Sequence, residues 1–242
     1  MVKTKNYDWS CLDRQLLVGF QNFAKSQLVG VSHTPASFVS IFRKLFKFFE
    51  VPIIIRLKKD PTNTLNDVCI GGCYYAYDDK GGKKAINIEF YFHPKSNSIK
   101  VSAKRFKEII NLVADTILHE MIHMRQWRRR NFKSIPGYES TAAFASKRKE
   151  QNYLGHPDEI DAYAFNIAIY LINRFKKDNQ IINYLNRDTR DKRMKMNSYV
   201  WYLRTFDNNH RHRVVKKLKK KIIYYLPNAK LGKPYKTSDW LK

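Results

Sequence analysis

Acidic residues are scarce in this sequence. Only 21 Asp and Glu accompany 46 Lys and Arg, which gives the 242-residue chain a net charge of +25. Solubility does not require such an excess, because a modest net charge with mixed signs keeps a domain in solution. A polyanionic partner explains it better, and nucleic acid is the simplest one because Lys and Arg contact phosphates and release counterions.

Cysteines and long apolar runs are also rare. Cys11, Cys69 and Cys73 are an odd number without zinc-ribbon spacing, so we expect free buried thiols, with Cys69 and Cys73 on or near a strand, in a reducing compartment. No apolar run approaches the roughly 18 residues that span a membrane, and no apolar signal region follows the first five residues. We therefore expect a cytoplasmic protein without a transmembrane segment.

The commonest residue types suggest a source. Lys, Asn, Ile and Tyr are abundant, which is typical of AT-rich genomes, including those of some phages. For a phage-encoded chain the expected locations are the host cytoplasm and the virion, and virion assembly becomes an expected role.

Residues 117–124 contain the pattern H-E-x-x-H inside an apolar stretch. His119 and His123 are four residues apart, so on a helix they share one face, about 6 Å apart along the axis. Two imidazoles placed in this way can each donate a nitrogen to one tetrahedral zinc ion. Glu120 then lies beside the metal, where it can take a proton from an activated water and return it to a leaving amine. The alternative is a core helix whose histidines bond to their neighbours.

This stretch resembles the zincin metallopeptidases, whose longer signature has Val or Thr three residues before the first histidine. Thr116 occupies that place, whereas Arg125 departs from the signature, which usually has an apolar residue there. The signature's uncharged positions hold Ile117, Met121, Ile122 and Met124. The resemblance covers about residues 85–175. It implies an α+β, zincin-like fold with a small mixed sheet packed on the buried motif helix and on a second ligand-bearing helix.

Two histidines and a water leave zinc one protein ligand short. Pro157 and the acidic pair at 158–159 predict the start of a second helix, whose apolar stripe continues to residue 171. Glu-ligand zincins take their third ligand from a downstream helix, and residues 159–164 resemble that element and a related run in ImmA/IrrE-type peptidases. The resemblance implies Glu159 as the ligand. Asp161 and His156 are the alternatives, and His156 would make SprT-like peptidases the better comparison.

The remaining elements follow from periodicity and turn residues. We predict helices over 8–30, from 34 to about 49, from a cap at Ser102 to about 127, and from 157 to about 177. We predict strands over 51–57, 68–77 and 85–93, a loop over 58–66, a turn over 78–83 and irregular chain over 131–150. The strand segment 86–92 is our candidate for pairing with an extended substrate.

The C-terminal region is the most basic, since residues 201–242 hold 12 Lys and Arg and two Asp. Residues 210–226 predict an amphipathic basic helix with aromatic residues nearby, which suits nucleic acid and equally suits packing on the core with lysines in water. The expected nucleic-acid surface comprises Arg128, Arg129, Arg130, Lys216, Lys217, Lys219, Lys220 and Lys221. We expect a zincin-like metallopeptidase domain at 1–177 and a basic helical extension at 178–242, packed on or following it.

The function expected from these features is zinc-dependent hydrolysis of peptide bonds in a protein or peptide substrate, on or near nucleic acid. Zn²⁺ would be held by His119, His123 and Glu159, with Glu120 as general base and then acid. Tyr163, or Tyr153, would stabilise the oxyanion. Two alternatives remain. One is a nucleic-acid-binding structural protein, such as a phage virion protein, with a structural or vestigial zinc site. The other is a zinc hydrolase acting on another kind of bond.

Overall fold

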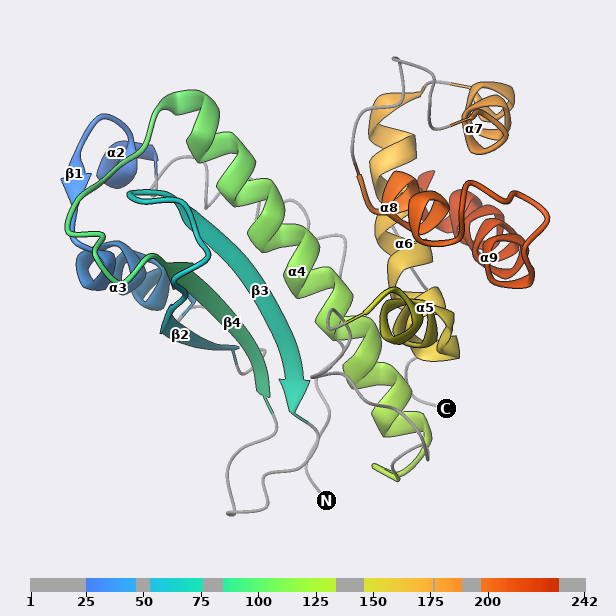
Figure 1. Cartoon of the computed structure of the whole chain (residues 1–242), viewed down its shortest axis with the longest axis horizontal. Helices are drawn as coiled ribbons and strands as arrows, with labels where there is room; N and C mark the ends of the chain where they lie inside the picture. The colour runs from blue at the N-terminus through green and yellow to red at the C-terminus, as the bar shows by residue number, and fades with distance from the viewer. Residues whose placement is uncertain are drawn as a thin grey trace. The chain divides into compact units, whose positions relative to one another are not determined.

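The structure is a computed structural model that describes residues 25–46, 53–75, 85–133, 146–175, 177–188 and 197–230. The chain divides into two compact units, residues 1–128 and 129–242. Helices accompany a small mixed sheet, so the expected α+β class is confirmed (Figure 1). No described helix is long and apolar enough to cross a membrane.

The first unit contains a three-stranded sheet in the order β2-β4-β3. β2 (Ile53–Lys59) runs parallel to β4 (Ala85–Phe92), and β3 (Val68–Tyr75) pairs antiparallel with β4. On one face of β4 the rings of Phe90 and Phe92 contact Phe38 of α3 (Pro35–Phe46), and Phe42 lies 4.7 Å from Phe90 between ring centroids. α2 (Lys25–Leu28) precedes a second, smaller sheet of β1 (Ser32–His33) and β5 (Ile99–Lys100). Alternating large apolar residues therefore build this core.

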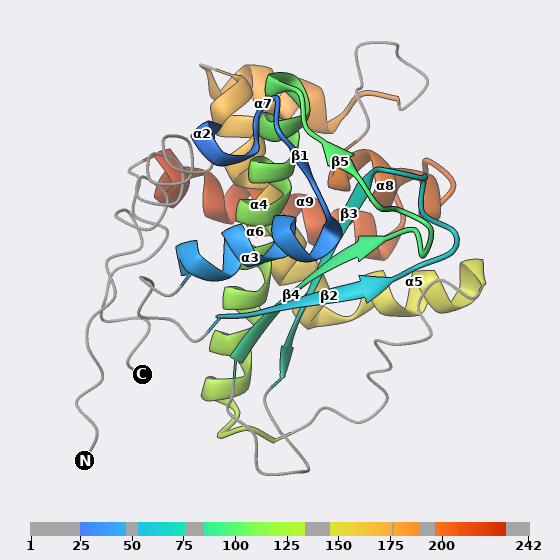
Figure 2. The same ribbon diagram turned by 90° about the vertical axis from the view of Figure 1, so that its left-hand side faces the viewer.

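β4 is the central strand of its sheet, hydrogen-bonded to β2 on one side and to β3 on the other. The prediction that residues 86–92 pair with an extended substrate is therefore wrong, because an added strand needs an unpaired edge. Among the described strands, β3 lies at the edge of the sheet that is closer to the motif helix α4 (Ala103–Arg129) (Figure 1 and Figure 2).

α4 has 27 residues and begins where the sequence predicts. The Ser102 side chain accepts a hydrogen bond from the backbone N–H of Arg105, at 3.1 Å, which is the bond of an N-cap. α4 contacts β3 on the face that carries the apolar side chains of β4, since Gly72 is the register partner of Ile88 and points at Thr116. The motif helix is thus packed against the sheet.

The second unit is helical. Its helices are α5 (Lys147–Gly155), α6 (Pro157–Arg174), α7 (Asp178–Leu185), α8 (Ser198–Thr205) and α9 (Arg213–Lys230). α9 lays its apolar side on α6, where the rings of Tyr225 and Phe165 are 5.4 Å apart. The Tyr225 hydroxyl also donates to Asp161 at 2.6 Å, and Lys221 forms an ion pair with the same carboxylate at 2.8 Å. Packing on the protein therefore accounts for the apolar side of the basic helix, and the domain boundary expected at residue 177 stays a prediction.

Some sequence-based bounds need correction. α5 occupies residues 147–155, in a stretch where we predicted irregular chain up to residue 150, and β2 continues to Lys59, through the start of the predicted loop. α6 ends at Arg174, three residues early, because the next residue is extended. The helix predicted to residue 30 ends at Leu28, since Val29 forms a bridge with Val101. The predicted turn over 78–83 and most of helix 8–30 lie outside the described residues.

The cysteines and aromatic residues also differ from expectation. Cys69 and Cys73 lie on β3 and form no disulfide, but Cys69 is exposed and Cys73 only half-buried, so the prediction of buried thiols is wrong for both. Cys11 lies outside the described residues. Among the aromatic residues that we expected near the basic helix, Tyr199 and Tyr202 have fully buried rings and therefore belong to the core, not to a stacking surface.

Candidate metal centre

The two motif histidines face each other from successive turns of α4. Their Nε2 atoms are 3.0 Å apart, and both side chains are 8% exposed. Two nitrogens bound to one tetrahedral zinc at 2.0–2.1 Å would be separated by about 3.3 Å, so the observed spacing fits a shared metal ion. The helical spacing of His119 and His123 thus produces the paired donors that the sequence predicts.

Gln126 orients the second histidine. Its Oε1 lies 2.8 Å from Nδ1 of His123, and both side chains are buried. A carbonyl oxygen only accepts, so Nδ1 carries the proton and donates it, which leaves the Nε2 lone pair directed at the neighbouring imidazole. Metal-binding histidines are commonly held by such a partner on the other ring nitrogen.

Glu159 lies in the first turn of α6 and is fully buried. Pro157 occupies the first turn, and Nδ1 of His156 accepts from the backbone N–H of Asp158 at 3.2 Å, so His156 is the N-cap. A buried carboxylate is costly unless positive charge or hydrogen bonds compensate for it. A metal ion would supply that charge.

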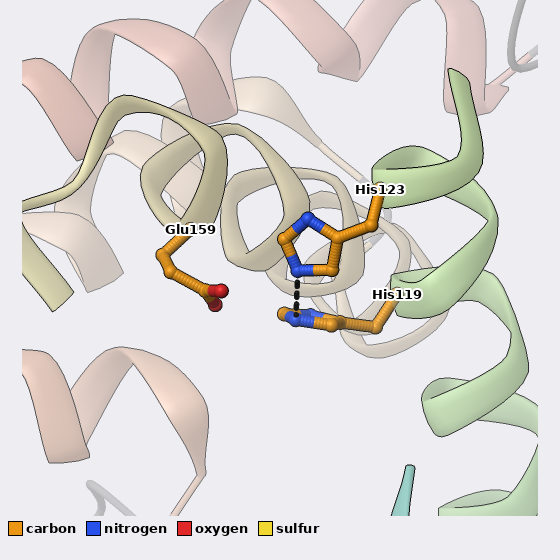
Figure 3. Close-up of side chains that lie close together, drawn as sticks. All are labelled: His119, His123 and Glu159. Carbon is orange, nitrogen blue, oxygen red and sulfur yellow. Dashed lines mark hydrogen bonds between the residues drawn. The ribbon is translucent and has the colours of Figure 1, made fainter. Parts of the chain in front are cut away.

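His119, His123 and Glu159 form a group of three buried side chains that can hold a metal ion, with one ligand atom from each lying within 4.8 Å of the others. Figure 3 shows the Glu159 carboxylate directed toward the two imidazoles. Within the residues that the structure describes, this is the group of His, Cys, Asp or Glu side chains that converges in this way. It includes neither Asp161, which bonds to Tyr225 and Lys221, nor the capping His156.

Glu120 is 5% exposed and lies against strand β3. A Cβ atom built on Gly72 would lie 3.4 Å from Cγ of Glu120, so the motif glutamate faces the glycine of this edge strand. On the same face of β3, burial raises the pKa of the Tyr74 phenol, against the opposing effect of the positive charge of Arg128.

Gly72 is required by its contact with α4. A Cβ at this position would lie 2.3 Å from the Thr116 methyl and 3.1 Å from the carbonyl oxygen of Asn87. The Thr116 hydroxyl donates to the Leu112 carbonyl at 2.8 Å, which holds the side chain in this rotamer. The threonine of the motif signature therefore packs directly on a glycine of the sheet.

We expect Gly72→Ala to lower the free energy of unfolding by about 1–3 kcal/mol, because an overpacked contact forces the strand and helix apart. Gly71→Ala is the matched control: its Cβ would meet a single flexible neighbour, the Tyr91 ring, at 3.1 Å. Urea unfolding measures both effects. Adding Thr116→Ala to Gly72→Ala should recover most of the loss, and equal losses for the two glycines would contradict this packing.

Two of the other expected residues, Tyr163 and Arg130, have structural contacts within the second unit. The Tyr163 ring packs edge-on against Trp201 and Tyr202, at 5.5 Å between centroids in each case. Arg130 forms an ion pair with Asp158 at 2.7 Å, which neutralises one of the cations expected to contact phosphate. The catalytic role of Tyr163 stays a prediction.

The sequence reading missed two residues at this centre. Gln126 is three residues after His123 and so lies on the same helix face, a signal that spacing alone offers. Gly72 follows another glycine within a predicted strand, which is a known sign of close backbone approach. Comparisons of the chain with protein-family models, curated proteins and solved structures gave no match.

Proposed function

We propose that the chain is a zinc-dependent metallopeptidase that acts on or near nucleic acid. The observation that supports this is the buried group of His119, His123 and Glu159 with Glu120 on the same helix as the two histidines. Two imidazoles and one carboxylate are the protein ligands of many catalytic zinc sites, which keep a fourth position for water or substrate. A structural zinc site usually uses four protein ligands, often cysteines.

Zinc bound by these residues would supply a Lewis acid that polarises the scissile carbonyl and lowers the pKa of water. Glu120 accepts a proton from the attacking water as the new C–O bond forms, and delivers it to the departing amine nitrogen as the C–N bond breaks. Gln126 keeps the proton of His123 on Nδ1, which leaves a lone pair on Nε2. The reaction consumes the peptide bond and one water, and its products are a carboxylic acid and an amine.

The test of this function is metal-dependent cleavage. Purified protein is incubated with a proteome-derived peptide library, and new N-termini are identified by mass spectrometry. We expect cleavage that disappears with a zinc chelator and returns when zinc is added back. Cleavage that persists with the metal removed, or none in zinc-loaded protein, would overturn the proposal.

Gln126→Leu should lower zinc affinity by about 10- to 100-fold, the usual cost of losing an outer partner of a metal-binding histidine. Leucine fills the volume of the buried glutamine but cannot accept the proton of His123. Gln126→Glu is the control, because a carboxylate keeps the acceptor. Competition with a chelator of known affinity measures both variants. Leucine and glutamate variants that bind zinc equally would show that the hydrogen bond does not matter.

The nucleic-acid part of the proposal depends on exposed positive charge. Lys216, Lys217 and Lys220 are exposed on α9, opposite the apolar side that packs on α6. Lys219 is half-buried, and its Nζ donates to Asn186 at 3.0 Å. Burial lowers the pKa of Lys219, so it is less suited to phosphate than the three exposed lysines.

A further inference from the structure

The second unit contains a pocket of about 470 Å³ whose residues lie on α5 and α8 or beside them. It is lined by Ser146, Lys147, Glu150, Trp201, Arg204 and Thr205. One large aromatic ring therefore lies among two cations, two hydroxyls and a carboxylate. None of these residues belongs to the candidate metal centre or to the basic surface predicted from the sequence.

Hydrogen bonds connect the segments that line the pocket. The indole N–H of Trp201 donates to the Glu150 carboxylate, and Gln151 donates from its side chain to the Thr205 carbonyl at 2.8 Å. The Trp201 ring also meets Tyr163 edge-on at 5.5 Å. The one acidic residue of the lining therefore fixes the tryptophan, and the ring is pre-positioned on packed helices.

The positive charges at the start of α5, beside this pocket, do not stabilise that helix. α5 begins with Lys147, Arg148 and Lys149, and cations in the first turn oppose the helix dipole. Lys147 forms an ion pair with Asp207, but their side chains are 55% and 69% exposed, and such a pair contributes little. Arg204 is exposed on α8. An anionic ligand would make this arrangement favourable.

We propose that this pocket binds single-stranded nucleic acid, with a base on the Trp201 ring and phosphates on Lys147 and Arg204. Aromatic platforms beside cationic side chains bind single strands, because every base offers a stacking face and every linkage a charge. Bases inside a duplex are already stacked on their neighbours and do not expose a face to the tryptophan. The inference deepens the nucleic-acid part of the proposed function and does not depend on peptide cleavage.

Binding is tested with a fluorescently labelled oligothymidylate by anisotropy, on the full chain. We expect Lys147→Gln with Arg204→Gln to weaken binding and to reduce the slope of log affinity against log salt by about 1.4, because each phosphate contact on a single strand contributes about 0.7. The matched control is Lys104→Gln with Lys107→Gln, which removes the same charge from exposed positions on α4, outside the expected nucleic-acid surface. Equal losses in the two double variants would overturn the proposal and indicate diffuse electrostatic attraction.

The base contact is tested separately. Trp201→Leu should weaken oligothymidylate binding by about 5- to 150-fold, the range for losing one stacked base, and should leave an abasic strand of equal charge unaffected. Trp201→Phe keeps a ring and should recover part of the loss if Leu disturbs the fold. Competition by poly-glutamate as strong as that by the oligonucleotide would overturn the assignment in favour of an acidic protein partner. Glu120→Gln should bind normally, which separates failure of this site from failure of the peptidase.

Discussion

Glu120→Gln is expected to abolish peptide hydrolysis while zinc stays bound. Glutamine has nearly the same volume as the buried glutamate but cannot take a proton from water, and losing a general base lowers kcat by about 10²- to 10⁴-fold. Because the three proposed ligands are unchanged, the zinc content should remain about one per chain. Cleavage of a peptide identified with the wild type, measured alongside elemental mass spectrometry, checks both halves of the prediction.

Glu108→Gln is the matched control, since Glu108 lies on the same helix with a side chain that is 47% exposed and paired with Arg105. It should keep wild-type activity. A Glu120→Gln protein that cleaves at the wild-type rate would remove Glu120 from the mechanism. If zinc-loaded wild type cleaves nothing and all three proteins bind oligonucleotide equally, the basic structural protein becomes the better account.

Glu159→Ala is expected to remove zinc from the purified protein. The carboxylate is one of three proposed ligands, and two histidines alone do not complete a tetrahedral site. Asp161→Asn should keep about one zinc per chain although it disturbs the bonds to Tyr225 and Lys221, and His156→Asn should keep it because asparagine can also cap α6. Elemental mass spectrometry on the three variants compares the residues considered as third ligand.

Loss of metal must be separated from loss of fold. Zinc that binds only the folded chain stabilises it, so Glu159→Ala and chelated wild type should unfold at similar temperatures, both below zinc-loaded wild type. Adding zinc should raise the melting temperature of wild type and leave the variant unchanged. If Glu159→Ala keeps its zinc while Asp161→Asn loses it, the third ligand is Asp161.

The sequence predicts the motif helix and its paired histidines because both depend on local spacing, whereas Glu159 was predicted from a family resemblance. A four-residue interval places two histidines on one helix face, and Ser102 and Pro157 mark helix starts that the structure contains. α5 was missed because its residues are polar, and Leu154 is its one buried side chain among those described. Its Ser146 cap is a signal that the sequence does carry.

Strand order is harder to predict than strand position. The alternation in residues 86–92 predicts a strand with one buried face, but a central strand and an edge strand share that pattern. Parallel pairing of β2 with β4 makes β4 central, and this pairing joins segments more than 30 residues apart. The sequence therefore located the strand but assigned it the substrate-pairing role of an edge.

The bonds between α6 and α9 limit how the protein can be dissected. The Asp161 carboxylate bonds to Lys221 and Tyr225 of α9, and Asp161 lies two residues after Glu159 on α6. The helix α9 therefore stabilises the turn that carries the proposed metal ligand. A truncated chain lacking α9 would lose these bonds, the apolar packing on α6 and the lysines together, so a structural defect would accompany any binding defect. The basic helix α9 and the helix α6 that carries Glu159 therefore cannot be studied by truncation, and single-charge exchanges on exposed lysines change one without disturbing the other.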